Sequence, residues 1–308
     1  MAGPPSFPPA AAGVAPPDAA ATLPIMRAGH RGPALVVAVL ATLGVWATWS
    51  IFVQNRTGRL LEEAAFDGAE FGQNRLWQIA EPVLDVISVP FIAVVLLATM
   101  LLAVLRRRTV LALQVAVLMG GANLTSRVLK LGVLDRPDLG IDGPLRNSLP
   151  SGHTTAAASV SAALVFVVPR RLRPAAAILG AIYTAATGVS TLVGQWHRPS
   201  DVVAALLVVL AWGALAGALG SHGPGVPGVE HPRETAAVAG LLLLAGLVSG
   251  GGAALALQRS LAGLDAGLES KAELLTAYGG GALAVVAFTC AAFGALLLLR
   301  RAAEPRRV

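Results

Sequence analysis

Hydrophobic residues in this chain gather in long stretches, and five of these stretches contain no charged residue. They run over residues 33–53, 86–105, 202–219, 236–257 and 274–299. Each reaches or approaches the roughly 20 residues that a helix needs to cross about 30 Å of hydrocarbon. The pattern predicts an all-α fold of the polytopic membrane type, a bundle of spanning helices.

Weaker apolar segments between these stretches raise the predicted number of spans to eight. We place the spans at about 34–53, 86–105, 109–127, 153–169, 174–193, 201–219, 236–257 and 277–299. The third, fourth and fifth contain Gly, Ser and Thr, and small residues let helices approach closely, so we expect these three inside the bundle. The connection over 54–85 is long and mixed in charge, and we expect it to be partly helical.

Composition divides the chain into four parts. Residues 1–32 are rich in Pro and Ala, cannot pack a core and are predicted to form a disordered tail. Residues 33–220 form a six-span core, and 221–234 form a Gly/Pro linker. Residues 235–308 add a two-span hairpin with a basic C-terminus. A lid, a dimer face and a lateral wall are open roles for this hairpin; we prefer an accessory hairpin and leave a homodimer open.

Charge fixes the expected orientation and excludes one class of partner. The chain is 55% hydrophobic, only 13% charged and carries a net charge of +6, whereas ordinary domains are about 25% charged. Most basic residues form short clusters between apolar segments, such as Arg106–Arg108 and Arg170–Arg173. Such clusters mark cytoplasmic loops rather than a nucleic-acid surface. We therefore expect a protein of the cell (inner) membrane with both termini in the cytoplasm.

Two connections on the opposite, extracytoplasmic side contain most of the candidate chemistry. Their polar residues are Lys130, Arg136, Pro150-Ser151-Gly152-His153, Ser190, Thr191, His197 and Asp201. An ionisable group at membrane depth costs roughly 2.5–3.5 kcal/mol on insertion scales. Several such groups at the ends of neighbouring spans therefore indicate one shared site.

Phosphate chemistry accounts for the cations and for the start of the fourth span. Phosphoryl transfer depends mostly on positioning and on stabilising negative charge. Lys130 and Arg136 supply positive charge, and Arg can bind an oxyanion through two hydrogen bonds. Ser151 and Gly152 begin a helix whose free backbone N–H groups form a ready anion site.

The two histidines and the aspartate fit nucleophilic attack on phosphorus. A neutral imidazole attacks with one nitrogen while a carboxylate bonded to the other nitrogen fixes its tautomer. Asp201 follows His197 by four residues, which is one turn if the segment is helical. His153 can protonate the leaving alcohol as general acid. This scheme requires no metal and no cofactor.

The arrangement resembles the type 2 phosphatidic acid phosphatase family, whose superfamily also includes the vanadium haloperoxidases. That family shows Lys-x6-Arg-Pro, Pro-Ser-Gly-His and Ser-Arg-x5-His-x3-Asp motifs. Residues 150–153 match the second motif in full, and Ser190, His197 and Asp201 match the third at the expected spacing. The resemblance covers about 34–219. It implies a nucleophile at His197, an orienting carboxylate at Asp201, a general acid at His153 and phosphate binding by Lys130, Arg136, Ser151 and Gly152.

Two positions depart from the family pattern. Five residues, not six, separate Lys130 from Arg136, and Thr191 stands where the third motif has arginine. Thr191 still offers a hydroxyl donor to phosphate. Arg127, Arg146 and Arg198 are all candidates for the replacement cation.

These patterns predict a membrane lipid phosphatase that acts through a phosphohistidine on His197. The resemblance implies a lipid phosphate ester or diphosphate as substrate, such as a prenyl diphosphate, phosphatidate or phosphatidylglycerophosphate. A lipid phosphotransferase on the same site remains an alternative. So does a non-catalytic protein that binds lipid phosphates, which Thr191 favours and the intact His153, His197 and Asp201 disfavour. A vanadium haloperoxidase is disfavoured because that chemistry belongs to soluble relatives.

Overall fold

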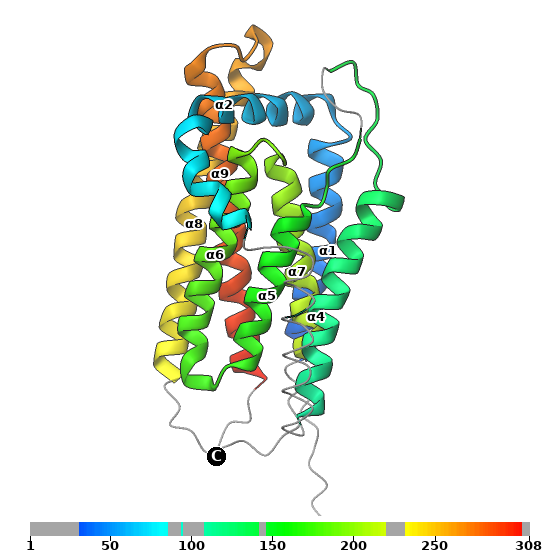
Figure 1. The fold of residues 1–308 in the computed structure, drawn as a ribbon, viewed down its shortest axis with the longest axis vertical. Helices are drawn as coiled ribbons and strands as arrows, with labels where there is room; N and C mark the ends of the chain where they lie inside the picture. The colour runs from blue at the N-terminus through cyan, green and yellow to red at the C-terminus, as the bar shows by residue number, and fades with distance from the viewer. Residues whose placement is uncertain (1–30, 86–93, 95–107, 142–145, 220–231, 304–308) are drawn as a thin grey trace, which may run out of the picture.

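Long helices running side by side make up most of the molecule (Figure 1). A computed structural model describes residues 31–85, 94, 108–141, 146–219 and 232–303. Over these residues the chain forms helices and loops and no strand. The main helices are α1 (Arg31–Phe52), α2 (Arg56–Asp85), α4 (Thr109–Val128), α5 (Gly152–Val167), α6 (Arg173–Val193), α7 (Pro199–Ala218), α8 (Pro232–Gly263) and α9 (Lys271–Ala302). Short helical turns are η2 (Leu129–Val133), η3 (Arg170–Leu172) and η4 (Leu264–Ala266).

Six helical segments among the described residues are long and apolar enough to cross a membrane. They are Arg31–Phe52, Thr109–Val133, Arg170–Val193, Pro199–Ala218, Arg233–Ala266 and Lys271–Ala302. The chain thus has the helices of a multi-pass membrane protein. A seventh predicted span is the apolar helix α5, which has 16 residues. The predicted span over 86–105 lies outside the described residues except for Val94, and so do most of the predicted tail and linker.

Helix α2 differs from the other helices because its first part lies across one end of the bundle, and its last part turns down along the side (Figure 1). It confirms that the connection over 54–85 is helical. Its 30 residues are mixed in charge and amphipathic, and its buried positions include Leu61, Ala65 and Ala69. An amphipathic helix of this kind suits the surface of a bilayer better than its interior. We call the part of the bundle that it covers the α2 end.

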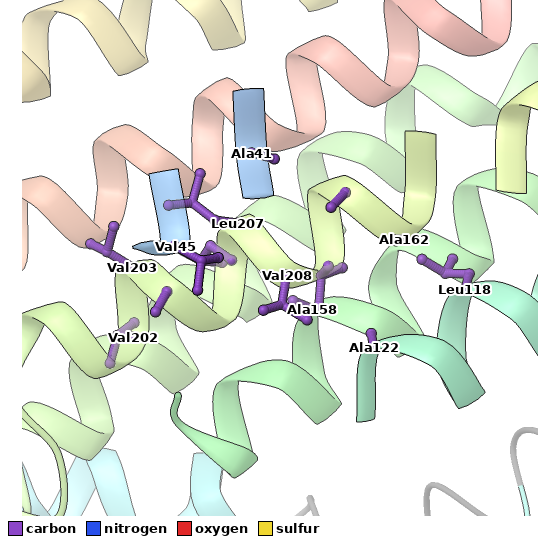
Figure 2. Close-up of a cluster of buried hydrophobic side chains, with 14 of the residues drawn as sticks. Ala41, Val45, Leu118, Ala122, Ala158, Ala162, Val202, Val203, Leu207 and Val208 are labelled. Carbon is purple, nitrogen blue, oxygen red and sulfur yellow. The ribbon is translucent and has the colours of Figure 1, made fainter. Parts of the chain in front are cut away.

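Helix α7 is the centre of the bundle, since it packs against α1, α4, α5 and α9. Figure 2 shows its Val202, Val203, Leu207 and Val208 among side chains from α1, α4 and α5. A helix that is apolar on all sides belongs inside a protein core or a membrane. Here α7 is enclosed by protein, and 78% of the residues in its most apolar stretch are buried.

Small residues let the neighbouring helices approach α7 and one another. The expected interior position is confirmed for α5, in which 11 of 16 residues are buried, and for α6, whose apolar window is 61% buried; α4 is less enclosed, at 39%. Gly121 on α4 shows the reason, because a Cβ there would lie 2.5 Å from the Trp212 ring on α7. No larger residue fits at this crossing.

The last two helices form an antiparallel pair, but they occupy different environments. Helix α8 packs mainly on α9, whereas α9 also contacts α2, α6 and α7. Helix α9 is therefore an integral part of the bundle and lies close to the N-terminus of α7. This position brings the C-terminal segment next to the α2 end, where the candidate site lies.

Candidate active site

The loop between α6 and α7 is folded by hydrogen bonds to one carbonyl group. The backbone N–H groups of Trp196 and His197 donate to the Thr191 oxygen at 3.0 and 3.3 Å, and Gln195 adopts a positive φ of 53°. Pro199 then opens α7 in its first turn, where its ring suits the helix and its missing N–H costs nothing. This turn fixes the position of His197, which lies two residues before the start of α7.

His197 and Asp201 form the expected pair. Nδ1 of His197 lies 3.0 Å from Oδ2 of Asp201, and both side chains are buried. The Arg198 N–H donates to the same Oδ2 at 3.0 Å, which caps α7 and holds the carboxylate in place. With the Nδ1 position committed to the carboxylate, Nε2 is the nitrogen left for chemistry.

The start of α5 is tied to the same turn of α7. Ser151 N–H donates to the Asp201 carbonyl at 2.8 Å, and Ser151 Oγ accepts from Thr154 N–H at 3.3 Å as the helix cap. Gly152 is exposed, and a Cβ there would meet no atom within 4 Å. The N-terminus of α5 therefore faces open space beside Asp201, and its glycine lets a ligand approach the backbone.

His153 lies at the same end of the molecule as His197, as the resemblance requires. It is half-buried in the first turn of α5, and its ring centroid lies 5.2 Å from that of Trp196, the residue before His197. It is also within electrostatic reach of His197 and Lys130. His153 from α5 and His197 from the loop between α6 and α7 thus lie in the same region.

Lys130 belongs to η2, a π-helical turn that continues α4. It interacts electrostatically with Asp201 and with Arg146. π-helical turns inside α-helices are frequent at functional sites, because the extra residue redirects side chains. The shortened spacing to Arg136 is therefore taken up by an irregular segment, and Lys130 remains within electrostatic reach of Asp201.

Arg136 and Arg198 share one carboxylate, that of Glu63 on α2. Arg136 Nη2 lies 2.9 Å from Glu63 Oε1, and Arg198 donates from Nε and Nη2 at 2.7–3.1 Å. Both guanidinium groups are buried, and that of Arg198 also stacks over Phe66 at 4.8 Å. Burial, together with the positive charges of Arg198 and Arg59, lowers the pKa of Arg136.

Arg59 adds a third buried guanidinium group near Glu63. Its side chain is fully buried, and Nη1 donates to the Pro137 oxygen at 3.3 Å, while Nε and Nη2 have no partner among the described residues. Arg136 Nε is likewise buried without a partner. Three arginines around Glu63 leave donors that an additional anion would satisfy.

Thr191 contributes its backbone rather than an open hydroxyl. Its side chain is fully buried, and Oγ1 donates to the Gly188 oxygen at 2.7 Å. The carbonyl of Thr191 accepts the two N–H groups that shape the His197 loop. Of the three candidate replacement cations, Arg198 is buried in the cluster, whereas Arg127 and Arg146 are exposed.

Residues 111–219 match the PAP2 superfamily. The chain carries a PAP2 superfamily domain. This PAP2 domain extends from the start of α4 to the end of α7, and it contains all eight residues predicted for the site. A domain of this kind implies phosphatase-like activity. No curated protein and no solved structure matches the chain.

Helix α2 lies outside the matched PAP2 segment and supplies the acidic residues that the motifs did not reveal. Besides Glu63, it provides Glu62, which accepts from Ser200 N–H at 3.0 Å and hydrogen bonds with the Ser200 hydroxyl. Burial, aided by the charge of Asp201, raises the pKa of Glu62 to about 8. A sequence signal existed: Arg59, Glu62 and Glu63 recur at helical spacing between the apolar residues of α2. Among the described residues, no three His, Cys, Asp or Glu side chains converge as metal ligands.

Proposed function

We propose that this protein is a membrane lipid phosphatase that cleaves a phosphate ester or diphosphate of a lipid at the α2 end. The observation that carries the proposal is the buried His197–Asp201 pair at 3.0 Å, with the Asp201 carbonyl bound to the N-terminus of α5. This geometry supports the proposal, in which His197 is the nucleophile, Asp201 orients it and the N-terminus of α5 binds the anion.

The reaction proceeds in two displacements at phosphorus. In the first, Nε2 of His197 attacks phosphorus, the P–N bond forms and the bond from phosphorus to the lipid oxygen breaks. His153 gives its proton to the departing oxygen, so that the lipid leaves as an alcohol or as a monophosphate. In the second, water attacks phosphorus and gives its proton to His153, the P–N bond breaks and inorganic phosphate leaves. Asp201 stabilises the positive charge on His197 between the two steps.

The cations of the site bind the phosphate oxygens in this scheme. Lys130, Arg136, the Ser151 hydroxyl and the Gly152 backbone N–H group surround the phosphoryl group, while the Ser151 N–H stays bonded to the Asp201 carbonyl. Arg198 supplies the positive charge that the third motif lacks at Thr191, whose role is to shape the loop. Because Glu63 engages Arg136 and Arg198, the substrate shares these guanidinium groups with a resident carboxylate.

The proposal places the α2 end on the extracytoplasmic side of the inner membrane and both termini in the cytoplasm. Described cations at the opposite end support this orientation, because Arg108, Arg170, Arg171 and Arg301 cluster there. The substrate is then an amphiphile in the outer half of the bilayer. The full bundle in this proposal consists of six PAP2-like spans followed by the α8–α9 hairpin.

A phosphate-release assay on the purified full chain in nanodiscs tests the proposal. The panel contains prenyl diphosphates, phosphatidate and phosphatidylglycerophosphate, and the proteins are the wild type, His197→Ala and the distant control Arg301→Ala. We expect release by the wild type and the control and a loss of at least about a thousandfold in His197→Ala. Equal release from the wild type and His197→Ala would overturn the phosphatase assignment.

The non-catalytic alternative has one observation in its favour, namely the Glu63 carboxylate that neutralises part of the arginine cluster. A protein of that kind would bind lipid phosphates in the same nanodiscs but release no phosphate from any of them. A phosphotransferase would release phosphate only slowly and would pass the labelled phosphoryl group to a second lipid. Product analysis with phosphorus-labelled substrate separates the three outcomes.

A further inference from the structure

A cavity of about 260 Å³ lies beside the N-terminus of α7, behind the first turn that holds Asp201. Its size is close to the lower end of the roughly 300–1,000 Å³ range of small-molecule sites. Five helices line it: α1, α2, α7, α8 and α9. The residues that line the cavity are not those proposed to bind phosphate. Four of the five helices, α1, α2, α8 and α9, also lie outside the PAP2 domain of residues 111–219.

The cavity faces the lipid side of the bundle. Its outer wall includes Ala254, Leu257 and Phe288, and all three are exposed on the outside of the helices. Helices α1 and α8 flank this wall. They have no extensive contact with each other, whereas α1 packs on α7 and α8 packs on α9. A long apolar chain from the bilayer can therefore enter sideways between α1 and α8 without unfolding the bundle.

The cavity is polar at one end and apolar at the other. The end of the cavity near α2 is lined by Glu62, Ser200 and Ser260. The end farther from α2 is lined by Ala253, Ala284 and Phe288, because α8 runs towards α2 and α9 runs away from it. Along α9 the lining extends from Ala277 to Phe288, which is about 16 Å at 1.5 Å per residue. This shape suits an amphiphile whose head lies under α2 and whose chain follows the helices.

Ser260 points to a ligand with a hydroxyl group. The residue is only 4% exposed, it lines the cavity, and its Oγ has no hydrogen-bond partner among the described residues. A buried hydroxyl without a partner costs about 1–3 kcal/mol, which a ligand hydroxyl would recover. Glu62 adds a second polar group at the same end, and its other contacts are with Ser200.

The charges around the cavity exclude a phosphate in this position. No Lys or Arg is among the residues that line it. Because the pKa of Glu62 is raised to about 8, the carboxyl group stays mostly neutral at pH 7, and on deprotonation it would repel an anion. The head of the ligand is therefore uncharged.

We propose that this cavity binds a long-chain lipid alcohol, with its hydroxyl group at Ser260 and Glu62 and its chain along α8 and α9. The identity of this alcohol as the dephosphorylated product rests on the proposed function; the binding itself does not. Pro199 and Ser200, which line the cavity, directly precede Asp201. The Cβ of a residue at Gly281 would lie 2.4 Å from Pro199 Cγ, so α9 is held tightly against this turn.

Photo-crosslinking of the full chain in nanodiscs tests the proposal. One probe is a long-chain alcohol with a diazirine in its chain; the others are its methyl ether and its phosphate. The variants are Ser260→Ala, Ala253→Trp, which fills the cavity, and Leu255→Trp, a matched control on the exposed face of α8. Peptide mapping by mass spectrometry locates the labelled residues.

We expect the alcohol to label residues 253–260 and 277–288 at least fivefold more than its methyl ether or its phosphate. Ala253→Trp lowers this labelling about tenfold, Leu255→Trp leaves it unchanged, and Ser260→Ala removes most of the preference over the ether. Equal labelling by the alcohol and the ether, or an unchanged yield in Ala253→Trp and Ser260→Ala, overturns the proposal. We expect the labelling to persist in His197→Ala, because binding of the alcohol does not need catalysis. The phosphatase assay can therefore fail while the alcohol site is confirmed, and the reverse.

Discussion

Helices α7 and α8 have nearly the same mean hydropathy, yet they occupy opposite environments. In α7, 78% of the apolar window is buried inside the protein, against 17% in α8. Lipid tails are as apolar as leucine, so hydropathy favours both helices in the membrane but does not decide which one is buried inside the protein. The difference in burial comes from packing and from polar contacts at the start of α7. Arg198, just before α7, binds Glu63 of α2, and the Asp201 carbonyl accepts the Ser151 N–H at the start of α5.

The comparison predicts that polar changes at the start of α7 have the largest effect on activity. Asp201→Asn removes the carboxylate that fixes the His197 tautomer and stabilises its positive charge, and kcat should fall by about 10²–10⁴-fold. Arg259→Ala on α8, an exposed cation at the same end of the bundle, should leave kcat unchanged. Steady-state phosphate release from the preferred lipid measures both. A kcat for Asp201→Asn within threefold of the wild type would contradict the assigned role.

Stability should depend strongly on the contact between α2 and the α7 terminus. Glu63→Gln removes the charge that balances buried Arg136 and Arg198, and breaking a buried pair in this way costs about 3–5 kcal/mol. Thermal unfolding in detergent should show a clear drop in Tm, with Glu70→Gln on the exposed side of α2 as the control. Addition of orthovanadate should restore more stability to Glu63→Gln than to the wild type. Identical melting curves of Glu63→Gln and the wild type would show that Glu63 does not stabilise the fold.

A matched pair of leucines tests the burial difference itself. Leu206 on α7 is 2% exposed and Leu247 on α8 is 74% exposed. Leu206→Ala leaves a cavity among close-packed helices and should cost about 2–5 kcal/mol. Leu247→Ala exchanges one lipid contact for another and should cost under about 0.5 kcal/mol. Chemical unfolding in mixed micelles gives both values, and equal losses would remove the distinction between the two helices.

Glu62 gives a smaller effect that depends on pH. The folded protein keeps its proton up to about pH 8, whereas the unfolded chain releases it near the ordinary value of 4.5. The folded state therefore binds more protons between these values, so the free energy of unfolding falls as pH rises through this window. Glu62→Gln removes this dependence on pH, so its Tm should fall less than that of the wild type between pH 6 and pH 9. The difference should be about 2–4 °C for each kcal/mol of unfolding free energy that the wild type loses. Parallel pH profiles in the two proteins would contradict the shift.

Much of the fold followed from the sequence because apolar length is a strong signal. Helices were predicted at seven of the eight positions within a few residues, from α1 to α9, because each carries its own hydrophobic stretch. The central place of α7 was not predicted. The small-residue criterion pointed to α4, α5 and α6, whereas α7 is rich in Val and Leu and is enclosed only because four other helices surround it.

The candidate site was predictable where spacing reports on local geometry. The four-residue step from His197 to Asp201 became a hydrogen bond in the first turn of α7, and the Ser151 cap appeared at the start of α5. The contribution of α2 was not predicted. Arg59 belongs to none of the three motifs, and nothing local indicated that Glu63 would meet Arg136 and Arg198 from 73 and 135 residues away.

Trapping of the covalent intermediate tests the central claim most directly. The wild type is mixed with a lipid diphosphate or phosphatidate labelled in the scissile phosphate, quenched in alkali, which preserves phosphohistidine, and digested for mass spectrometry. The account predicts a phosphoryl group on His197, absent from His197→Ala. Label on any other residue, or steady phosphate release with no label on His197, would contradict it.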